Sequence, residues 1–395
     1  MSWMKHTGCR YHTQDEWYYC GGAAAMMILA EIGVPYDDLD QDDLYDSNHD
    51  HNAKTGWYTD PYGLRYTLVD RRPAGFTNTF VVHAPTSEAD GTRDIVYTLH
   101  QYNVSPAVLV FHCMHWIVVP GVQTDVEPVS GASYTVEGFW IHNPVHYEPP
   151  PPPPHSAVDA CGSGGSHGTA NDFVTYASWQ STYFTGCTYD DPAGAAQYIS
   201  VCDPDVRDIE RPRRQAREFP AAGRKLLTAA EAVRHSKAGL AQYRLDKDRR
   251  VATALRRARP GKPILVARLD RPNTYYHLVP WGTARSVAAL TQVDARRGAF
   301  LSIHLQEKAG RPAMLTPDAV LKLVTHKRFE LPDGLGKLRV FPEAICLSPM
   351  LVWQPCRESF SPHLPFYQLT VGGRKLYVRI DGKVFTRLTT TGRGM

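Results

Sequence analysis

The chain has 395 residues, of which 43% are apolar and 21% are charged. This composition excludes wholesale disorder and supplies enough apolar surface for two domains, each with its own core. No stretch has the roughly 18 apolar residues of a membrane span, and the N-terminus lacks the apolar segment of a secretory signal, so we expect a cytoplasmic protein without a membrane span.

The formal net charge of +3 is unevenly distributed along the chain. Residues 1–150 contain 19 acidic and 7 basic side chains, a net charge of −12, whereas residues 205–259 contain 7 acidic and 16 basic ones, a net charge of +9. A nucleic-acid surface is one interpretation of the basic segment, but no recognised nucleic-acid motif accompanies it. We therefore favour a solvated helical face, which can also dock on the acidic first domain, over a nucleic-acid partner.

The first half of the chain begins with helical patterns. Residues 20–32 are almost continuously apolar and are followed by Gly33 and Pro35, which predicts a helix that is buried on nearly every face. Asp60 is a good N-cap for a second helix over 61–71, and residues 92–102 favour a third helix.

Strand patterns follow these helices. Residues 107–111, 116–119 and 134–141 form short runs that are rich in β-branched and aromatic residues. Helices first and strands second predict an α+β domain in which an antiparallel sheet packs against the buried helix.

A proline-rich stretch interrupts this domain. Six prolines at 149–154 and a Gly/Ser-rich run at 162–168 are interpreted as an insertion of about 148–170, because strand-like patterns resume at 173–183 and 197–201. We place the domain boundary after Pro204, with a first domain over 1–204, a basic linker over 205–225 and a second domain over 226–395.

The second domain also has an α+β pattern, and its sequence resembles no family that we recognise. Its predicted helices cover 226–245 and 249–259, and its predicted strands cover 263–269, 275–279, 290–293 and 300–305.

The eight cysteines are too sparse for a disulfide framework, and none forms a Cys-x-x-Cys pair, so we expect mostly free thiols. If the protein were exported without a signal, Cys187 and Cys202 would be the first candidates for a disulfide. The histidines concentrate before residue 168, but their spacing matches no standard zinc signature, and we predict neither a metal nor another cofactor.

Cys20 is the strongest candidate for a chemical role. A thiol is nucleophilic as the thiolate, and its pKa of about 8.5 falls at a helix N-terminus or beside an imidazolium. Cys20 opens the predicted buried helix, and the glycines at 21 and 22 leave room for a substrate backbone at a cost in helix propensity. The alternative is an unreactive core cysteine.

Three further residues complete a possible catalytic site. His115 opens an apolar strand and is the candidate base, with His112 as the competing choice. Asn143, at the end of a later strand, is a candidate to orient the imidazole, although Asn-Pro also starts ordinary turns. Gln14 carries an amide N–H that could join the backbone N–H of Cys20 in stabilising an oxyanion.

The order Gln14, Cys20, His115, Asn143 resembles the papain superfamily of cysteine peptidases, most closely the bacterial branch related to double-glycine leader peptidases. The resemblance covers about residues 10–204, and the Gln-x5-Cys-Gly helix start is its most specific part. It implies a papain-like fold with Gln14 as oxyanion donor, Cys20 as nucleophile, His115 as base and Asn143 as the orienting residue. Glycine stands at position 22, where relatives often have proline, and Asn143 replaces the aspartate common in that branch.

These residues favour a peptidase or amidase that acts on a peptide or protein through a thioester. If an amine takes the place of water, the same residues give an acyltransferase, such as a transglutaminase-like enzyme. The alternative from another class is a binding module that has kept the fold and lost turnover, with the basic segment and the C-terminal domain providing recognition.

Overall fold

The computed structural model describes residues 2–145, 169–202, 209–213, 225–283, 286–306, 315–331, 336–341 and 349–395. The chain divides into two compact units, Met1–Glu218 with Gly392–Met395, and Phe219–Thr391. The division after Glu218 falls inside the expected linker rather than at Pro204. The expected insertion lies almost entirely outside the described residues. The last four residues belong to the first unit, although the whole second unit separates them from it in sequence.

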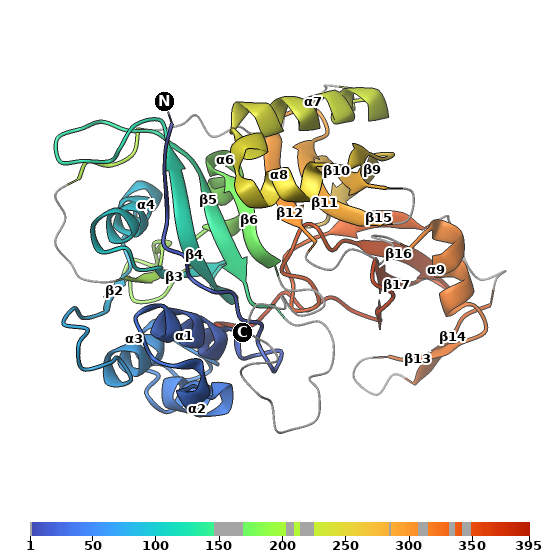
Figure 1. Cartoon of the computed structure of the whole chain (residues 1–395). Helices are drawn as coiled ribbons and strands as arrows, with labels where there is room; N and C mark the ends of the chain where they lie inside the picture. Colours follow the sequence, from blue (N-terminus) through green and yellow to red (C-terminus); the bar gives the residue numbers. More distant parts are fainter. Residues whose placement is uncertain are drawn as a thin grey trace. The chain divides into compact units, whose positions relative to one another are not determined.

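A buried helix is the centre of the first unit. Helix α1 (Cys20–Glu31) contacts α2 (Gln41–Asp50), α3 (Pro61–Asp70) and the sheet, and ten of its 12 residues are buried, as its continuous apolar sequence predicts. Helix α3 begins as predicted, with the Asp60 carboxylate accepting a hydrogen bond from the N–H of Gly63. Figure 1 shows α1, α2 and α3 gathered beside one end of the strands of this unit.

The predicted helices differ from the observed ones at two places. Helix α2 was not predicted, because its sequence is polar and its capping aspartate, Asp40, lies in an acidic run. Helix α4 (Glu88–Tyr97) begins four residues before the predicted start at 92 and continues as a π-helical turn over Thr98–Tyr102.

The sheet of the first unit is antiparallel throughout its described pairings, and it contacts α1 as predicted. The strand order is β6-β5-β4-β3-β7-β2, and β1 pairs with β4. The strands are β1 (Trp3–His6), β2 (Val81–His83), β3 (Ala107–Val110), β4 (His115–Thr124), β5 (Val136–Asn143), β6 (Thr169–Thr175) and β7 (Ser200–Cys202).

The strand expected over 173–183 is wrong beyond residue 175. Strand β6 ends at Thr175, and the chain continues as α6 (Tyr176–Ser178) and a π-helical turn over Trp179–Tyr183. Trp179 and Tyr183 are fully buried, so their aromatic pattern reflects burial rather than strand periodicity.

The second unit is also α+β, as predicted. Its main sheet has the order β12-β11-β10-β9-β15-β16-β17-β18, with β8 paired to β10, and β13 and β14 form a separate hairpin. The helices are α7 (Ala229–Gln242), α8 (Arg249–Leu255) and α9 (Pro317–Val324). The strands are β8 (Arg259–Pro260), β9 (Ile264–Arg268), β10 (Tyr275–Gly282), β11 (Val287–Asp294), β12 (Phe300–Leu305), β13 (Arg328–Glu330), β14 (Lys337–Arg339), β15 (Met350–Trp353), β16 (Phe366–Val371), β17 (Arg374–Arg379) and β18 (Val384–Phe385).

Part of the basic segment lies on acidic side chains of the first unit. Arg211 Nε is 2.6 Å from a carboxylate oxygen of Asp90, and Arg213 Nη1 is 3.4 Å from one of Asp125. Arg213 also donates its backbone N–H to the carbonyl of Tyr134 over 2.8 Å. These contacts support the interpretation that basic residues after the first domain dock on its acidic surface.

The expectation of mostly free thiols holds for the described cysteines apart from one disulfide. Cys113 and Cys187 form this disulfide between residues 74 positions apart, whereas Cys202, the suspected partner of Cys187, is a buried thiol outside any disulfide. Disulfides of this kind are rare in reducing compartments. No helix in the described part of the chain is long and apolar enough to cross a membrane.

Candidate active site

Cys20 is the first residue of α1, and its side chain is completely buried. Its Sγ accepts a hydrogen bond of 3.2 Å from the backbone N–H of Trp116, the residue that follows His115 in β4. The packing of α1 against β4 therefore brings the predicted nucleophile to the strand end that carries the predicted base.

The glycines behind Cys20 serve a different purpose from the one expected. A Cβ atom on Gly21 would lie 2.5 Å from the Thr59 side chain, and one on Gly22 would lie 3.2 Å from the carbonyl oxygen of Gln41. Neighbouring segments of the protein therefore fill the space beside both glycines. The glycines allow close packing of α1 and leave no space there for a substrate backbone.

His115 and Asn143 lie side by side at the ends of neighbouring antiparallel strands. His115 begins β4, Asn143 ends β5, and the ring Nε2 is 2.9 Å from Asn143 Oδ1. Which ring nitrogen carries the hydrogen depends on the tautomer: when Nε2 donates to Asn143 Oδ1, Nδ1 of the neutral ring is the nitrogen that can take a proton. His112, the competing choice, is exposed, and its Nδ1 lies 3.3 Å from the carbonyl of Gly186.

Gln14 is buried beside the end of β5, where its backbone N–H donates to the carbonyl of Pro144 over 2.7 Å. Its side-chain amide donates over 2.8 Å to the carbonyl of Glu16, and Oε1 has no hydrogen-bond partner among the described residues. The N–H that bonds Glu16 is not free for an oxyanion. Only the second N–H of this amide remains for the predicted role.

Burial controls the ionisation of the site. It raises the pKa of the Cys20 thiol well above its ordinary value, although the N–H groups of Trp116, Gly21 and Cys20 act in the opposite direction. Burial also lowers the pKa of His115 to about 4, against the opposing effect of its hydrogen bonds to Met395 and Asn143. Both groups are therefore neutral near pH 7 in this structure, and the expected low pKa of Cys20 is not observed.

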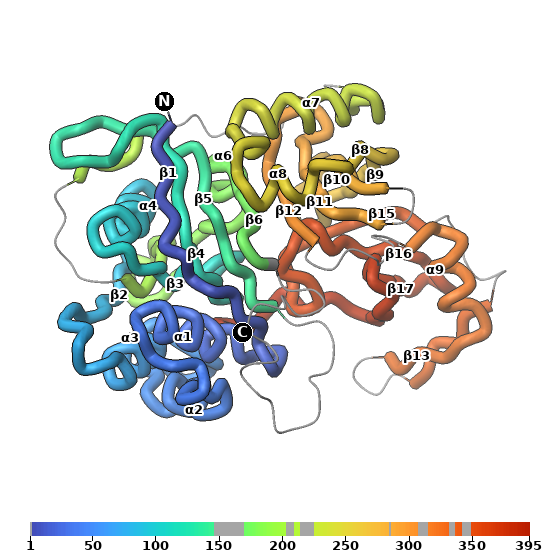
Figure 2. The backbone as a smooth tube through the Cα atoms, in the orientation of Figure 1, coloured from blue at the N-terminus to red at the C-terminus, as the bar shows by residue number. Residues whose placement is uncertain are grey.

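The segment Gly392–Met395 contacts the candidate site. The main-chain oxygen of Met395 lies 2.8 Å from His115 Nδ1, the ring nitrogen that does not face Asn143, and the Met395 residue is only 2% exposed. The tube in Figure 2 ends, in red, beside α1. No sequence pattern indicates this contact, because 280 positions separate the two residues.

The backbone turn before His115 has an unusual conformation. Phe111, His112 and Cys113 have φ values of 54°, 58° and 62°, in the left-handed region that residues with side chains rarely adopt. The disulfide to Cys187 fastens this turn to the loop that precedes β7. A strained turn beside candidate catalytic residues is typical of functional sites.

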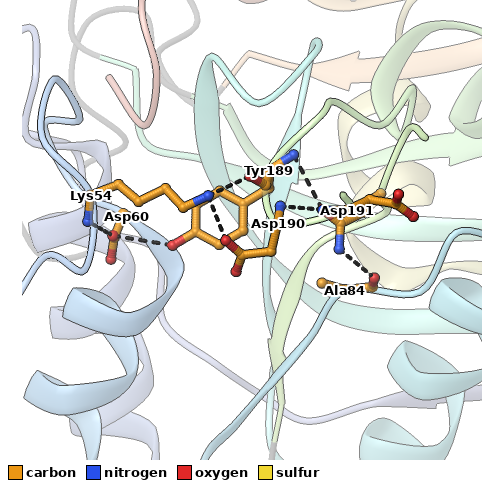
Figure 3. Close-up of polar contacts among 7 residues, drawn as sticks. Lys54, Asp60, Ala84, Tyr189, Asp190 and Asp191 are labelled. Carbon is orange, nitrogen blue, oxygen red and sulfur yellow. Dashed lines mark hydrogen bonds and ion pairs between the residues drawn. The ribbon is translucent and has the colours of Figure 1, made fainter. Parts of the chain in front are cut away.

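A polar network connects that loop to the segment before α3 (Figure 3). The Lys54 ammonium contacts the Tyr189 carbonyl and lies 2.5 Å from the Asp190 carboxylate, while the Tyr189 hydroxyl donates to Asp60 over 3.2 Å. The side-chain oxygen of Gln197 accepts from three consecutive backbone N–H groups, those of residues 189–191. The turn at 111–113 and the segment before α3 are therefore joined through one loop.

Comparisons with family models, curated proteins and solved structures gave no match to this chain. Within the described residues, no group of three or more His, Cys, Asp or Glu side chains is arranged to hold a metal ion. The chemical interpretation of the site therefore depends on its own geometry.

Proposed function

We propose that the first unit is a cysteine-nucleophile peptidase or amidase with a papain-like arrangement of Cys20, His115 and Asn143. The observation that supports it most is the 2.9 Å bond between His115 Nε2 and Asn143 Oδ1, at the strand end that also holds the Cys20 sulfur. In this arrangement Asn143 fixes the ring and leaves Nδ1 to exchange protons with the thiol.

The reaction follows from these positions. Nδ1 of His115 takes the proton of the Cys20 thiol, and the sulfur forms a bond to the carbonyl carbon of the substrate. The carbon–nitrogen bond then breaks, and the leaving amine takes the proton from the imidazolium. Water next loses a proton to His115 and attacks the thioester, which releases the carboxylic acid and the thiol. The backbone N–H of Cys20 and the remaining N–H of Gln14 are the candidate oxyanion donors.

A second candidate function is a binding module without turnover. It is favoured by the complete burial of Cys20 and by its raised pKa, which are ordinary properties of a structural cysteine. The two candidates differ in one measurable property, the acidity of the Cys20 thiol when the site is open to solvent.

The test is the rate of alkylation by iodoacetamide from about pH 5 to 9, with each adduct located by peptide mass spectrometry. A buried thiol reacts through transient opening, so the pH profile reports the acidity of the opened site. In the wild type, we expect the rate of Cys20 alkylation to reach half of its maximum below about pH 8.5. In His115→Ala, this midpoint should return toward about pH 8.5.

Cys356, a buried thiol of the second unit whose pKa is raised by burial and by Glu358, is the internal control and should give the same profile in both proteins, with no midpoint below that of an ordinary thiol. If Cys20 and Cys356 give the same profile, and His115→Ala changes neither, the peptidase proposal is wrong and the binding module remains.

A further inference from the structure

The segment Gly392–Met395 is bound along its main chain, and it contacts both sides of the candidate site. On one side, the N–H of Tyr58 donates to the carbonyl of Arg393 over 3.1 Å. On the other side, the N–H groups of Gly394 and Met395 donate to the carbonyls of Cys113 and Met114 over 2.9 and 2.7 Å. Peptide ligands are commonly held by main-chain bonds of this kind.

The position of Gly394 accepts no side chain. Its φ of 63° lies in the left-handed region, and a Cβ atom there would lie 2.0 Å from the carbonyl oxygen of Thr59. That oxygen belongs to the backbone and also accepts a 3.0 Å hydrogen bond from the Trp116 indole, so it cannot move aside cheaply. This position therefore requires glycine.

The preceding position leaves its side chain accessible. The guanidinium of Arg393 lies over the Trp57 ring, 5.5 Å from the ring centre, and Arg393 itself is exposed. A cation above an aromatic ring is attracted by the ring quadrupole, and the net negative charge of residues 1–150 acts in the same direction.

The end of the segment occupies the nitrogen that the proposed reaction needs. With Nε2 of His115 bonded to Asn143, proton transfer depends on Nδ1, and Nδ1 is 2.8 Å from the main-chain oxygen of Met395. Both oxygens only accept, so the neutral ring donates to Asn143 or to Met395 but not to both at once; in either tautomer the Met395 oxygen occupies the position beside Nδ1 that the Cys20 thiol needs.

We propose that Gly392–Met395 is an intramolecular ligand that closes the Cys20 site by occupying the position of a peptide substrate. This inference rests on the proposed function and adds a ligand class to it, a peptide with glycine in the left-handed conformation at the position of Gly394 and a basic residue before it. The site becomes active when the segment leaves.

The test uses the full chain and the variant Gly394→Val, in which the side chain clashes with the Thr59 carbonyl. Gly131→Val is the matched control, because Gly131 also has a left-handed φ of 70° but has no atom within 4 Å of an added Cβ. We expect iodoacetamide to modify Cys20 in Gly394→Val about tenfold or more faster than in the wild type and in Gly131→Val.

A second variant, shortened to end at Thr391, covers the possibility that Gly394→Val misfolds, and its circular dichroism is compared with that of the wild type. The synthetic peptide Thr-Gly-Arg-Gly-Met should slow Cys20 alkylation in this shortened chain, whereas Thr-Gly-Arg-Val-Met should not. Equal alkylation rates in the wild type and the shortened chain, or equal effects of the two peptides, would overturn the inference.

The two proposals fail separately. If release of the segment exposes a Cys20 thiol with an ordinary pH profile, the closure of the site is supported and the catalytic proposal is rejected. If the wild-type profile is already acidic and release changes no rate, the catalytic proposal is supported and the closure is rejected.

Discussion

At the scale of single residues, the environment of His115 determines what the site does at rest. The ring is fully buried between Asn143 and the Met395 main chain, and burial holds its pKa at about 4. The unfolded chain takes up the proton near pH 6.5, whereas the native chain does so only near pH 4. The unfolded state therefore binds more protons between these values, and stability falls as the pH falls through this window.

We predict that His115 alone removes about 2 kcal/mol of stability from the first unit between pH 7 and pH 5. Over the same pH range, the variant His115→Gln should lose about 2 kcal/mol less stability than the wild type. The free energy of unfolding is measured in urea at both pH values. Hydrogen exchange of peptides from β4 monitors the unfolding, so that the signal reports on the first unit. Other buried histidines contribute equally to both proteins, so parallel losses would contradict the prediction.

At the scale of elements, the β3–β4 connection positions both His115, the proposed base, and the segment Gly392–Met395. Its residues 111–113 have left-handed φ values, Cys113 is disulfide-bonded, and the carbonyls of Cys113 and Met114 hold the C-terminal segment. Strained backbone persists only where the surroundings hold it in place. The disulfide and the Lys54–Asp190 contact provide that restraint.

Removal of the disulfide in a Cys113→Ala/Cys187→Ala double variant should therefore destabilise the first unit by about 2–4 kcal/mol, since a crosslink between residues 74 positions apart restricts the unfolded chain. Thermal unfolding with and without a phosphine reductant measures this effect. The reductant should lower the melting temperature of the wild type and leave that of the double variant unchanged. A wild type that is insensitive to the reductant would show that the crosslink adds no stability.

At the scale of the whole molecule, the chain leaves the first unit after Glu218 and returns to it at Gly392. The proposed closing segment is thus separated in sequence from Cys20, the proposed nucleophile, by the whole second unit. The segment is held by main-chain hydrogen bonds and by the close packing of Gly394 against the Thr59 carbonyl, and only its last two residues are buried. Segments with so few buried apolar contacts open readily compared with a core strand.

We predict that the amide hydrogens of Gly394 and Met395 exchange about a hundredfold slower than in a free peptide of the same sequence, yet faster than those of β4. Hydrogen exchange with fragmentation to single residues measures both. Exchange at the free-peptide rate would mean that the segment is not docked in solution. Protection equal to that of β4 would mean that the segment is released only when the whole first unit unfolds.

The local features of this protein can be predicted from its amino-acid sequence. Continuous apolar residues predicted the buried helix at Cys20, Asp60 and Pro61 predicted the start of α3, and apolar runs predicted β3, β4 and β5. These features follow from periodicity and capping, which act over a few residues. The choice of Cys20, His115 and Asn143 as site candidates also came from local patterns.

The surroundings of those candidates come from the packing of distant segments. This packing pairs Cys113 with Cys187 instead of Cys187 with Cys202, makes His115 rather than His112 the neighbour of Asn143, and places the Met395 main-chain oxygen beside Nδ1 of His115. It also made Cys20 a buried neutral thiol, although its helix position favours a thiolate. Pairings between distant residues, and the loss of water around a charge, depend on packing that no short stretch of sequence encodes.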